Sequence, residues 1–211
     1  MREEAVRDSV QSAADTQVAV KGESIEVTVK HIPGEPGVWL FLLGDMVIFG
    51  LFFIVFLYHR GQDVPLYLES QKALDQNIGI INTLLLLTSS WFVVTAVRMA
   101  RKDTSRAGVW IALAFFFGLG FVINKFFEYK AKLQAGITLF TNDFYMYYYI
   151  FTGIHLWHVI MGLGVLACMW RLTRLKSPNS QHIAFLEGGA SFWHLVDVLW
   201  IILFPLLYLL R

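Results

Sequence analysis

His155 and His158 lie three residues apart in a long apolar run, so they share one face of a helix. Two histidines on a helix can ligate haem or a metal ion, but a metal site needs further ligands. The only other histidine deep in an apolar run is His194. Three histidines could hold catalytic zinc, whereas a redox copper site also requires a thiolate or thioether. Hydrogen bonding between helices is the more ordinary role of such histidines, and we favour it.

Asp45 is a carboxyl group inside the first apolar run. It lies eight residues beyond Gly37, about 12 Å along a helix. The surrounding segment, GDMVIF, offers no basic neighbour at helical spacing, and an isolated carboxyl in an apolar medium takes up a proton. Asp45 is therefore either a proton-sensitive or interface carboxyl, or a neutral acid that is hydrogen-bonded to a neighbouring helix. We favour the second interpretation.

The last apolar run carries Trp193, His194 and Asp197. His194 and Asp197 share a helix face and can pair, which would lower the cost of burying both. Glu187 precedes this group and is followed by two glycines, which permit close helix approach. These polar groups could form a proton relay or a structural seam between helices, and the residues alone leave both open.

Two further groups lie near the ends of apolar runs. Glu128 follows Lys125 by one helical turn, so the two can form an internal ion pair. Trp170, Arg171 and Arg174 make a basic and aromatic rim that suits an anionic lipid headgroup. Ordinary anchoring of a span by positive charge explains the rim equally well.

The composition indicates a membrane protein. Among 211 residues, 56% are hydrophobic and 16% are charged, against about 25% charged in soluble domains. The 17 basic and 16 acidic residues give no basic surplus, so we expect no nucleic-acid partner. Cys168 is the single cysteine, which excludes a disulfide, a four-thiolate metal site and a two-cysteine copper centre.

Five apolar stretches are long enough to cross a bilayer as helices, which needs about 20 residues each. They cover about residues 37–58, 78–97, 108–129, 145–170 and 190–210. The fold class is therefore all-α, a five-helix transmembrane bundle over residues 37–211. Residues 1–36 are acidic and lack aromatic side chains, so we expect a disordered arm that stays on the cytoplasmic side.

Basic residues are distributed unequally between the connecting loops. The loops after the second and fourth spans hold Arg98, Arg101, Lys102, Arg106, Arg171, Arg174 and Lys176. The loops on the other face hold Arg60, Lys72, Lys130 and Lys132. Because basic loops stay in the cytoplasm, the sequence predicts a cytoplasmic N-terminus.

Several motifs together resemble cytochrome c oxidase subunit III, over residues 38–211. Residues 191–200 (SFWHLVDVLW) resemble that family's last helix (YWHFVDVVW), and residues 152–162 (TGIHLWHVIMG) resemble its TGFHGLHVIIG segment. Residues 186–190 (LEGGA) resemble its FEAGA, and Glu128-Tyr129 and Asn82-Thr83 match further polar steps. The longer form of the family has seven helices with a lipid-filled cleft; this chain has five, and Asp45 replaces the family's buried glutamate.

The resemblance implies a non-redox accessory subunit of a haem–copper respiratory oxidase in a bacterial inner membrane. No haem or copper would be bound on this chain; both would belong to partner subunits, and phospholipid would be bound. The implied partners are catalytic subunit I, subunit II and membrane lipids. The ionisable residues named above and Trp193 would be buried polar ties between helices, and Arg171 the best candidate contact to a lipid headgroup.

Other functions remain open from the sequence. The five-helix form and the opening PGEPGVW (residues 33–39) also resemble the subunit-III-like protein associated with nitric oxide reductases. A b-type haem protein could use two of the deep histidines as ligands. A proton channel around Asp45 is a further alternative, although no central span contains the proline that a broken transport helix often has.

Overall fold

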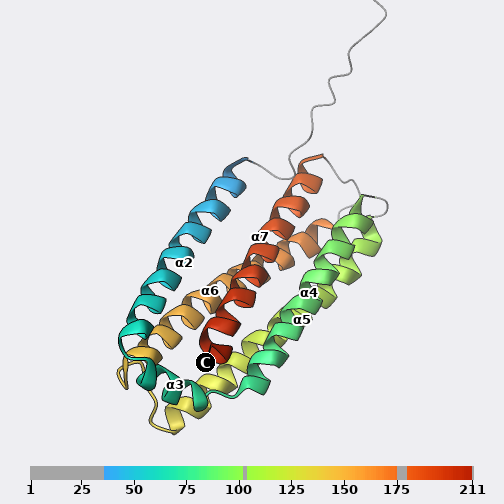
Figure 1. Ribbon diagram of the computed structural model, residues 1–211. Coiled ribbons are helices and arrows are strands. Elements are labelled where there is room, and N and C mark those ends of the chain that lie inside the picture. Colours follow the sequence, from blue (N-terminus) through green and yellow to red (C-terminus); the bar gives the residue numbers. More distant parts are fainter. Residues whose placement is uncertain (1–35, 102–103, 175–179, 211) are drawn as a thin grey trace, which may run out of the picture. The chain divides into compact units, whose positions relative to one another are not determined.

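A computed structural model describes residues 36–101, 104–174 and 180–210. The long helices are α2 (Pro36–Gln62), α4 (Gln76–Ala100), α5 (Thr104–Gln134), α6 (Asp143–Leu172) and α7 (Ser180–Phe204). A short helix α3 (Val64–Lys72) follows α2, and a π-helical turn η1 (Pro205–Leu209) follows α7 (Figure 1). All five long helices are apolar and long enough to cross a membrane, which confirms the predicted all-α five-span bundle. Residues 1–35 of the predicted arm lie outside the described residues.

The start of α7 differs most from the predicted spans. α7 begins at Ser180, ten residues before the predicted start at residue 190, and so includes Glu187. The sequence pattern placed a boundary there because Glu187 and two glycines interrupt the apolar run. The structure accommodates the carboxylate within the helix, because Arg101 pairs with it.

Helix α3 was not predicted from the sequence. Asp63 and Pro65 resemble a break between spans, yet they begin a new helix. The Asp63 side chain accepts a hydrogen bond from the Leu66 amide at 3.2 Å, and Pro65 occupies the first turn. α3 therefore connects α2 to α4, and its own residue Tyr67 is buried.

Four of the long helices pack closely. α4 packs along α5, α5 along α6, α6 along α7, and α7 along α4. The Trp193 ring fits between α5 and α6 because glycines face it. A Cβ atom at Gly118 or at Gly162 would lie 2.7 or 2.6 Å from that ring. Small residues thus allow close approach of helices in a membrane.

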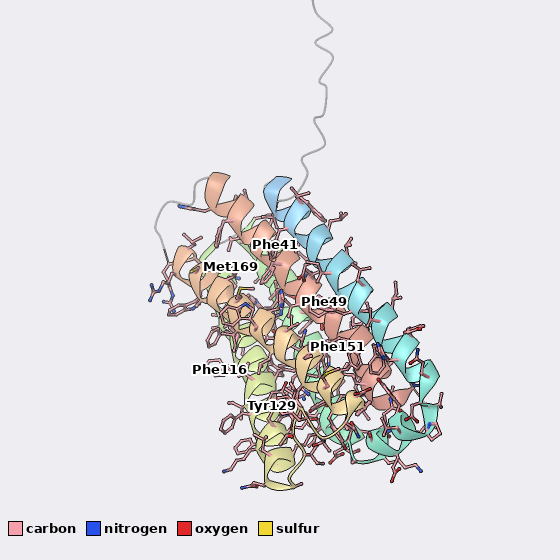
Figure 2. All side chains as sticks on the ribbon, turned by 90° about the vertical axis from the view of Figure 1, so that its left-hand side faces the viewer. Phe41, Phe49, Phe116, Tyr129, Phe151 and Met169 are labelled. Carbon is pink, nitrogen blue, oxygen red and sulfur yellow. The ribbon has the colours of Figure 1, made fainter. Side chains whose placement is uncertain are left out.

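Helix α2 lies beside this group and contacts α7 and α3. Its aromatic side chains reach α6: the rings of Phe52 and Phe53 each lie 6.0 Å from the ring of Phe151. Figure 2 shows Phe49 and Phe151 between the two helices. α2 and α6 are therefore joined mainly by long side chains.

Large apolar side chains cover the outside of the bundle. Trp91, Phe116, Phe126 and Trp157 are each at least 60% exposed, and Figure 2 shows Phe116 pointing outward. Exposed apolar surface of this extent is rare on soluble monomers. Facing lipid, it is the expected surface of a membrane-spanning bundle.

Candidate functional site: buried polar groups between helices

The largest buried polar group centres on an ion pair within α5. The Lys125 ammonium donates to a Glu128 carboxylate oxygen at 2.9 Å, as the one-turn spacing predicted. The Lys125 side chain is completely buried, and that of Glu128 is 5% exposed. Because a buried charge is costly without a partner, each stabilises the other.

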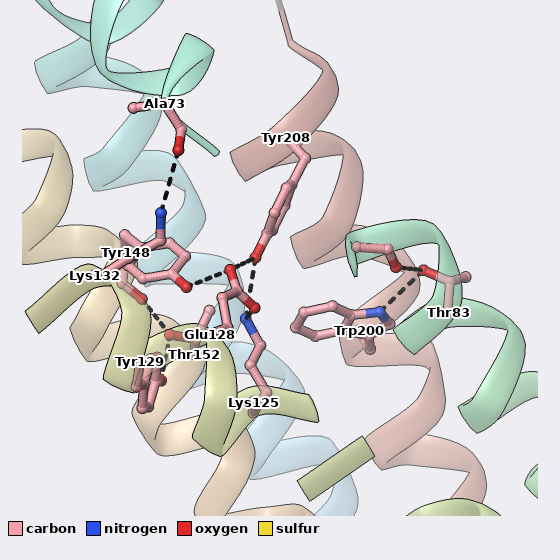
Figure 3. Close-up of polar contacts among 11 residues, drawn as sticks. Ala73, Thr83, Lys125, Glu128, Tyr129, Lys132, Tyr148, Thr152, Trp200 and Tyr208 are labelled. Carbon is pink, nitrogen blue, oxygen red and sulfur yellow. Dashed lines mark hydrogen bonds and ion pairs between the residues drawn. The ribbon is translucent and has the colours of Figure 1, made fainter. Parts of the chain in front are cut away.

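Two tyrosines complete the coordination of this pair. The hydroxyls of Tyr148 on α6 and Tyr208 in η1 each donate to the second Glu128 oxygen at 2.6 Å (Figure 3). The Lys125 ammonium also donates to the Tyr208 hydroxyl at 3.0 Å. We call these four residues the Lys125 cluster. Both Glu128 oxygens are engaged, so the cluster joins three elements as a satisfied structural tie.

Aromatic rings surround the Lys125 ammonium. It lies 4.9 Å from the centre of the Trp200 ring, 5.2 Å from Tyr148, 5.6 Å from Tyr208 and 5.8 Å from Tyr129. The faces of aromatic rings attract cations at these distances. The rings therefore replace part of the hydration that the ammonium loses on burial.

Further hydrogen bonds connect neighbouring helices to the cluster. Tyr129 and Thr152 hydroxyls lie 2.6 Å apart, and the Thr152 hydroxyl also donates to the Tyr148 carbonyl at 2.6 Å. The Trp200 indole N–H donates to the Thr83 hydroxyl at 3.0 Å, which links α7 to α4 (Figure 3). Together these contacts tie four helices at one end of the bundle.

Asp45 has a partner that its own helix could not reveal. Its carboxyl lies 3.2 Å from Nε2 of His158 on α6. The other ring nitrogen, Nδ1, lies 2.9 Å from the Ile154 carbonyl and must donate, because a carbonyl only accepts. One proton therefore lies between Nε2 and the carboxyl, whether the pair is neutral or ionic.

His155 lies apart from His158 despite the shared helix. Its ring is completely buried, 5.5 Å from the ring of Phe121 and 5.3 Å from that of Trp200. Neither ring nitrogen has a hydrogen-bond partner in the part of the chain that the structure describes. His155 thus packs within the aromatic core while His158 faces α2.

The predicted pairing of His194 with Asp197 is wrong. Nδ1 of His194 lies 2.5 Å from the hydroxyl of Ser90 on α4. Ser90 also interacts with the Asp197 carboxyl. A hydroxyl from a neighbouring helix separates the two groups, and the spacing along α7 could not indicate it. Asp197 and Trp193 are both buried. The Trp193 indole nitrogen has no hydrogen-bond partner among the described residues, so this ring packs against glycines and does not form the expected polar tie.

Charged groups also lie at the end where α4 finishes and α7 begins. Arg101 donates to the Glu187 carboxylate at 2.7 Å, and Glu187 is buried. The Arg174 guanidinium lies 4.9 Å from the centre of the Trp170 ring, while Arg171 is exposed. Trp170 and Arg171 thus lie in the last turn of α6 and Arg174 lies just beyond it, and their contact with a lipid headgroup stays a prediction.

An apolar groove lies between α2 and the α6–α7 pair. Its volume is about 740 Å³. It is lined by Gly37, Val38 and Phe41 from α2, by Val165 from α6, and by Ala184, Phe185, Gly188, Gly189 and Phe192 from α7. The lining residues come from the first two turns of α2, from the second to fourth turns of α7 and from the second half of α6.

The described residues contain no group of three or more histidine, cysteine, aspartate or glutamate side chains placed to hold a metal ion. The three deep histidines contact different partners on different helices. Four members of these polar contacts were not predicted from the sequence: Tyr148, Tyr208, Ser90 and Arg101. For Tyr148 and Tyr208 the sequence held one indication, because a tyrosine hydroxyl buried in an apolar run needs a hydrogen-bond partner.

These features define a class of protein: a five-helix membrane bundle whose polar residues join helices. The sequence matches the family model for cytochrome c oxidase subunit III over residues 20–210. The chain belongs to this family. Its relatives include cytochrome c oxidase subunit 3 of Thermostichus vulcanus, 32% identical over 92% of this chain and 98% of the relative.

Two further relatives extend the comparison. Cytochrome c oxidase subunit 3 of Alkalihalophilus pseudofirmus is 31% identical over 94% of this chain and 97% of its own length. Heme-copper oxidase subunit I+III of Aeropyrum pernix is 30% identical over 81% of this chain, and the match covers 22% of that longer protein. As a family member, the chain is an accessory subunit of a haem–copper oxidase.

Proposed function

We propose that this chain packs against the large catalytic subunit of its oxidase, stabilises that subunit's active site and proton-uptake route, and holds no haem or copper of its own. The observation that carries this proposal is the use of its buried polar groups. The Lys125 cluster, the Asp45–His158 pair and the Arg101–Glu187 pair all join helices within the chain. A rigid bundle of this kind is suited to a supporting role.

Subunit I is the partner that we propose for this chain. The relative from Aeropyrum pernix is named as subunit I+III, so both parts occur in one polypeptide there. A fused pair of subunits supports direct contact between the corresponding separate ones. Subunit II is a further partner expected from the family resemblance.

We propose that the chain also binds phospholipid. The apolar groove beside α2 has space for apolar chains. The rim formed by Trp170, Arg171 and Arg174 supplies charge that suits an anionic headgroup. Arg171 is the best candidate for the headgroup contact because it is exposed.

The non-redox role can be tested on the chain after it has been separated from its complex. We expect the isolated chain to be colourless, and readdition to a depleted oxidase to slow the loss of catalytic rate. A haem spectrum on the isolated chain would contradict the proposal and support the b-type haem alternative. A His155→Leu variant would then reveal whether that histidine is a ligand.

A further inference from the structure

Helix α2 is held differently along its two halves. Its second half is packed by aromatic rings: Phe56 lies 5.5 Å from Tyr67 of α3 and 5.8 Å from Phe151 of α6. Near its end, Arg60 donates to the Leu210 carbonyl at 3.1 Å. Several independent contacts therefore fix this half of α2.

The first half of α2 borders the apolar groove instead. Gly37, Val38 and Phe41 form one wall, and α6 and α7 form the other. Phe41 approaches Phe192 across the groove, with ring centres 6.1 Å apart (Figure 2 shows Phe41 at this end). The groove of about 740 Å³ therefore lies beside this half of α2, and the Phe41–Phe192 contact crosses it.

The Asp45–His158 pair lies between these two halves. Asp45 follows Phe41 by one turn and precedes Phe49 by one turn, on the same side of α2. Phe49 is buried and its ring contacts the His158 ring, with centres 5.6 Å apart. The pair thus lies where the packed half of α2 meets the half that borders the groove.

We propose that the Asp45–His158 pair is a latch that sets how far the first half of α2 stands from α6 and α7. Beyond the pair, α2 borders the groove and most of its residues are exposed, although Leu42 is buried and Phe41 contacts Phe192. Within an apolar medium a hydrogen bond between helices has no water to replace it. Loss of the pair would therefore let the first half of α2 swing away and widen the groove, while the aromatic contacts keep the second half in place.

The two halves can be followed separately by distance measurements between spin labels in the full chain in lipid nanodiscs. The native Cys168 is exposed and takes one label on α6. Leu40→Cys, at a position 76% exposed, takes the second label on the first half of α2. Leu57→Cys, at a position 47% exposed, takes it instead on the second half and serves as the matched control.

We expect Asp45→Leu to lengthen and broaden the distance from residue 40 to residue 168 and to leave that from residue 57 unchanged. Asp45→Asn can still hydrogen-bond to the His158 ring and should keep both distances. An unchanged distance from residue 40 in Asp45→Leu would overturn the proposal. An equal change of both distances would also overturn it, because it would show a general loosening of the bundle. An opening in Asp45→Asn as large as in Asp45→Leu would exclude the hydrogen bond as the latch.

Discussion

Lys125 carries a charge in the interior of a bundle that spans a membrane. A counter-charge and aromatic rings around the ammonium stabilise it there. Glu128 supplies the counter-charge, and four aromatic rings lie within 6 Å of the ammonium. Removing one member of a buried ion pair leaves the other charge unpaired, which is more damaging than losing the whole pair.

We therefore expect Lys125→Met to lower the free energy of unfolding by about 3–5 kcal/mol. The double variant Lys125→Met/Glu128→Gln should lose less, because the glutamine still accepts from the two tyrosines. Thermal unfolding in detergent, followed by tryptophan fluorescence, measures the stability of the single and the double variant. The control is Lys130→Met, since Lys130 is exposed and should have little effect. Equal losses in the single and double variants would contradict a charge-paired Lys125.

Tyr67 lies on α3, outside the spans, and is the residue for which the structure predicts a pH dependence. Burial, and then the negative charges of Tyr147, Asp143 and Asp63, raise the pKa of the Tyr67 phenol to about 12. Because the folded state holds this proton more tightly than the unfolded state, its contribution to stability is complete below pH about 10. The contribution is lost as the pH rises from about 10 towards 12.

We expect wild type to lose more stability than Tyr67→Phe between pH 10 and 12, and equal slopes below pH 9. Unfolding midpoints across this range measure the difference, and ultraviolet absorbance of tyrosinate should show one fewer late-titrating group in the variant. The exposed Tyr58 provides the control Tyr58→Phe. Parallel curves for wild type and Tyr67→Phe throughout would be inconsistent with the raised pKa.

At the scale of helices, the start of α7 depends on a residue from another loop. Arg101, just past the end of α4, pairs with Glu187 two turns into α7. Arg101 is 61% exposed, so solvent weakens the interaction. The pair nevertheless helps to hold the polar first turns of α7 in helical form beside α4.

We expect Arg101→Ala to lower the stability of the bundle by about 1 kcal/mol, with faster hydrogen exchange confined to the first turns of α7. Arg98→Ala is a matched control, because Arg98 is also exposed at the end of α4. Hydrogen exchange read by mass spectrometry distinguishes the first turns of α7 from the end of α4. Exchange that is unchanged around residue 187 would show that other contacts hold this end of α7.

The helices themselves could be predicted because each apolar run is long enough to cross a bilayer and the loops between them are polar. Contacts between helices could not. Lys125 and Glu128 lie one turn apart, so their pairing was visible in the sequence. His158 was not visible as the partner of Asp45, nor Ser90 as that of His194, because spacing along one helix carries no information about its neighbours.

The α7 start and α3 were missed for a related reason. Glu187 is typical of the edge of a span, but within α7 its carboxylate pairs with Arg101, which the sequence did not indicate. Asp63 and Pro65 are equally typical of a loop and of the start of a helix. In the folded chain the segment is a helix, and burial of the Tyr67 side chain of α3 stabilises it over a loop.

At the scale of the whole molecule, the distribution of basic residues predicts the orientation in the membrane. We expect the loop between α5 and α6 to face outward and that between α6 and α7 to face the cytoplasm. Phe140→Cys, at a position 91% exposed, should react with an impermeant maleimide on intact cells, in a background where Cys168 is alanine. Ser177→Cys should react only after permeabilisation, and the reverse pattern would place the N-terminus outside.

We propose that this family member supports a separate catalytic subunit. The most direct measurement is purification of the tagged chain from native membranes in mild detergent, followed by a visible spectrum and mass identification of everything that accompanies it. We predict a haem-containing, oxygen-reducing subunit I in the same complex. A nitric-oxide-reducing partner would redirect the assignment to the related accessory protein. A chain that emerges alone and colourless would contradict the claim.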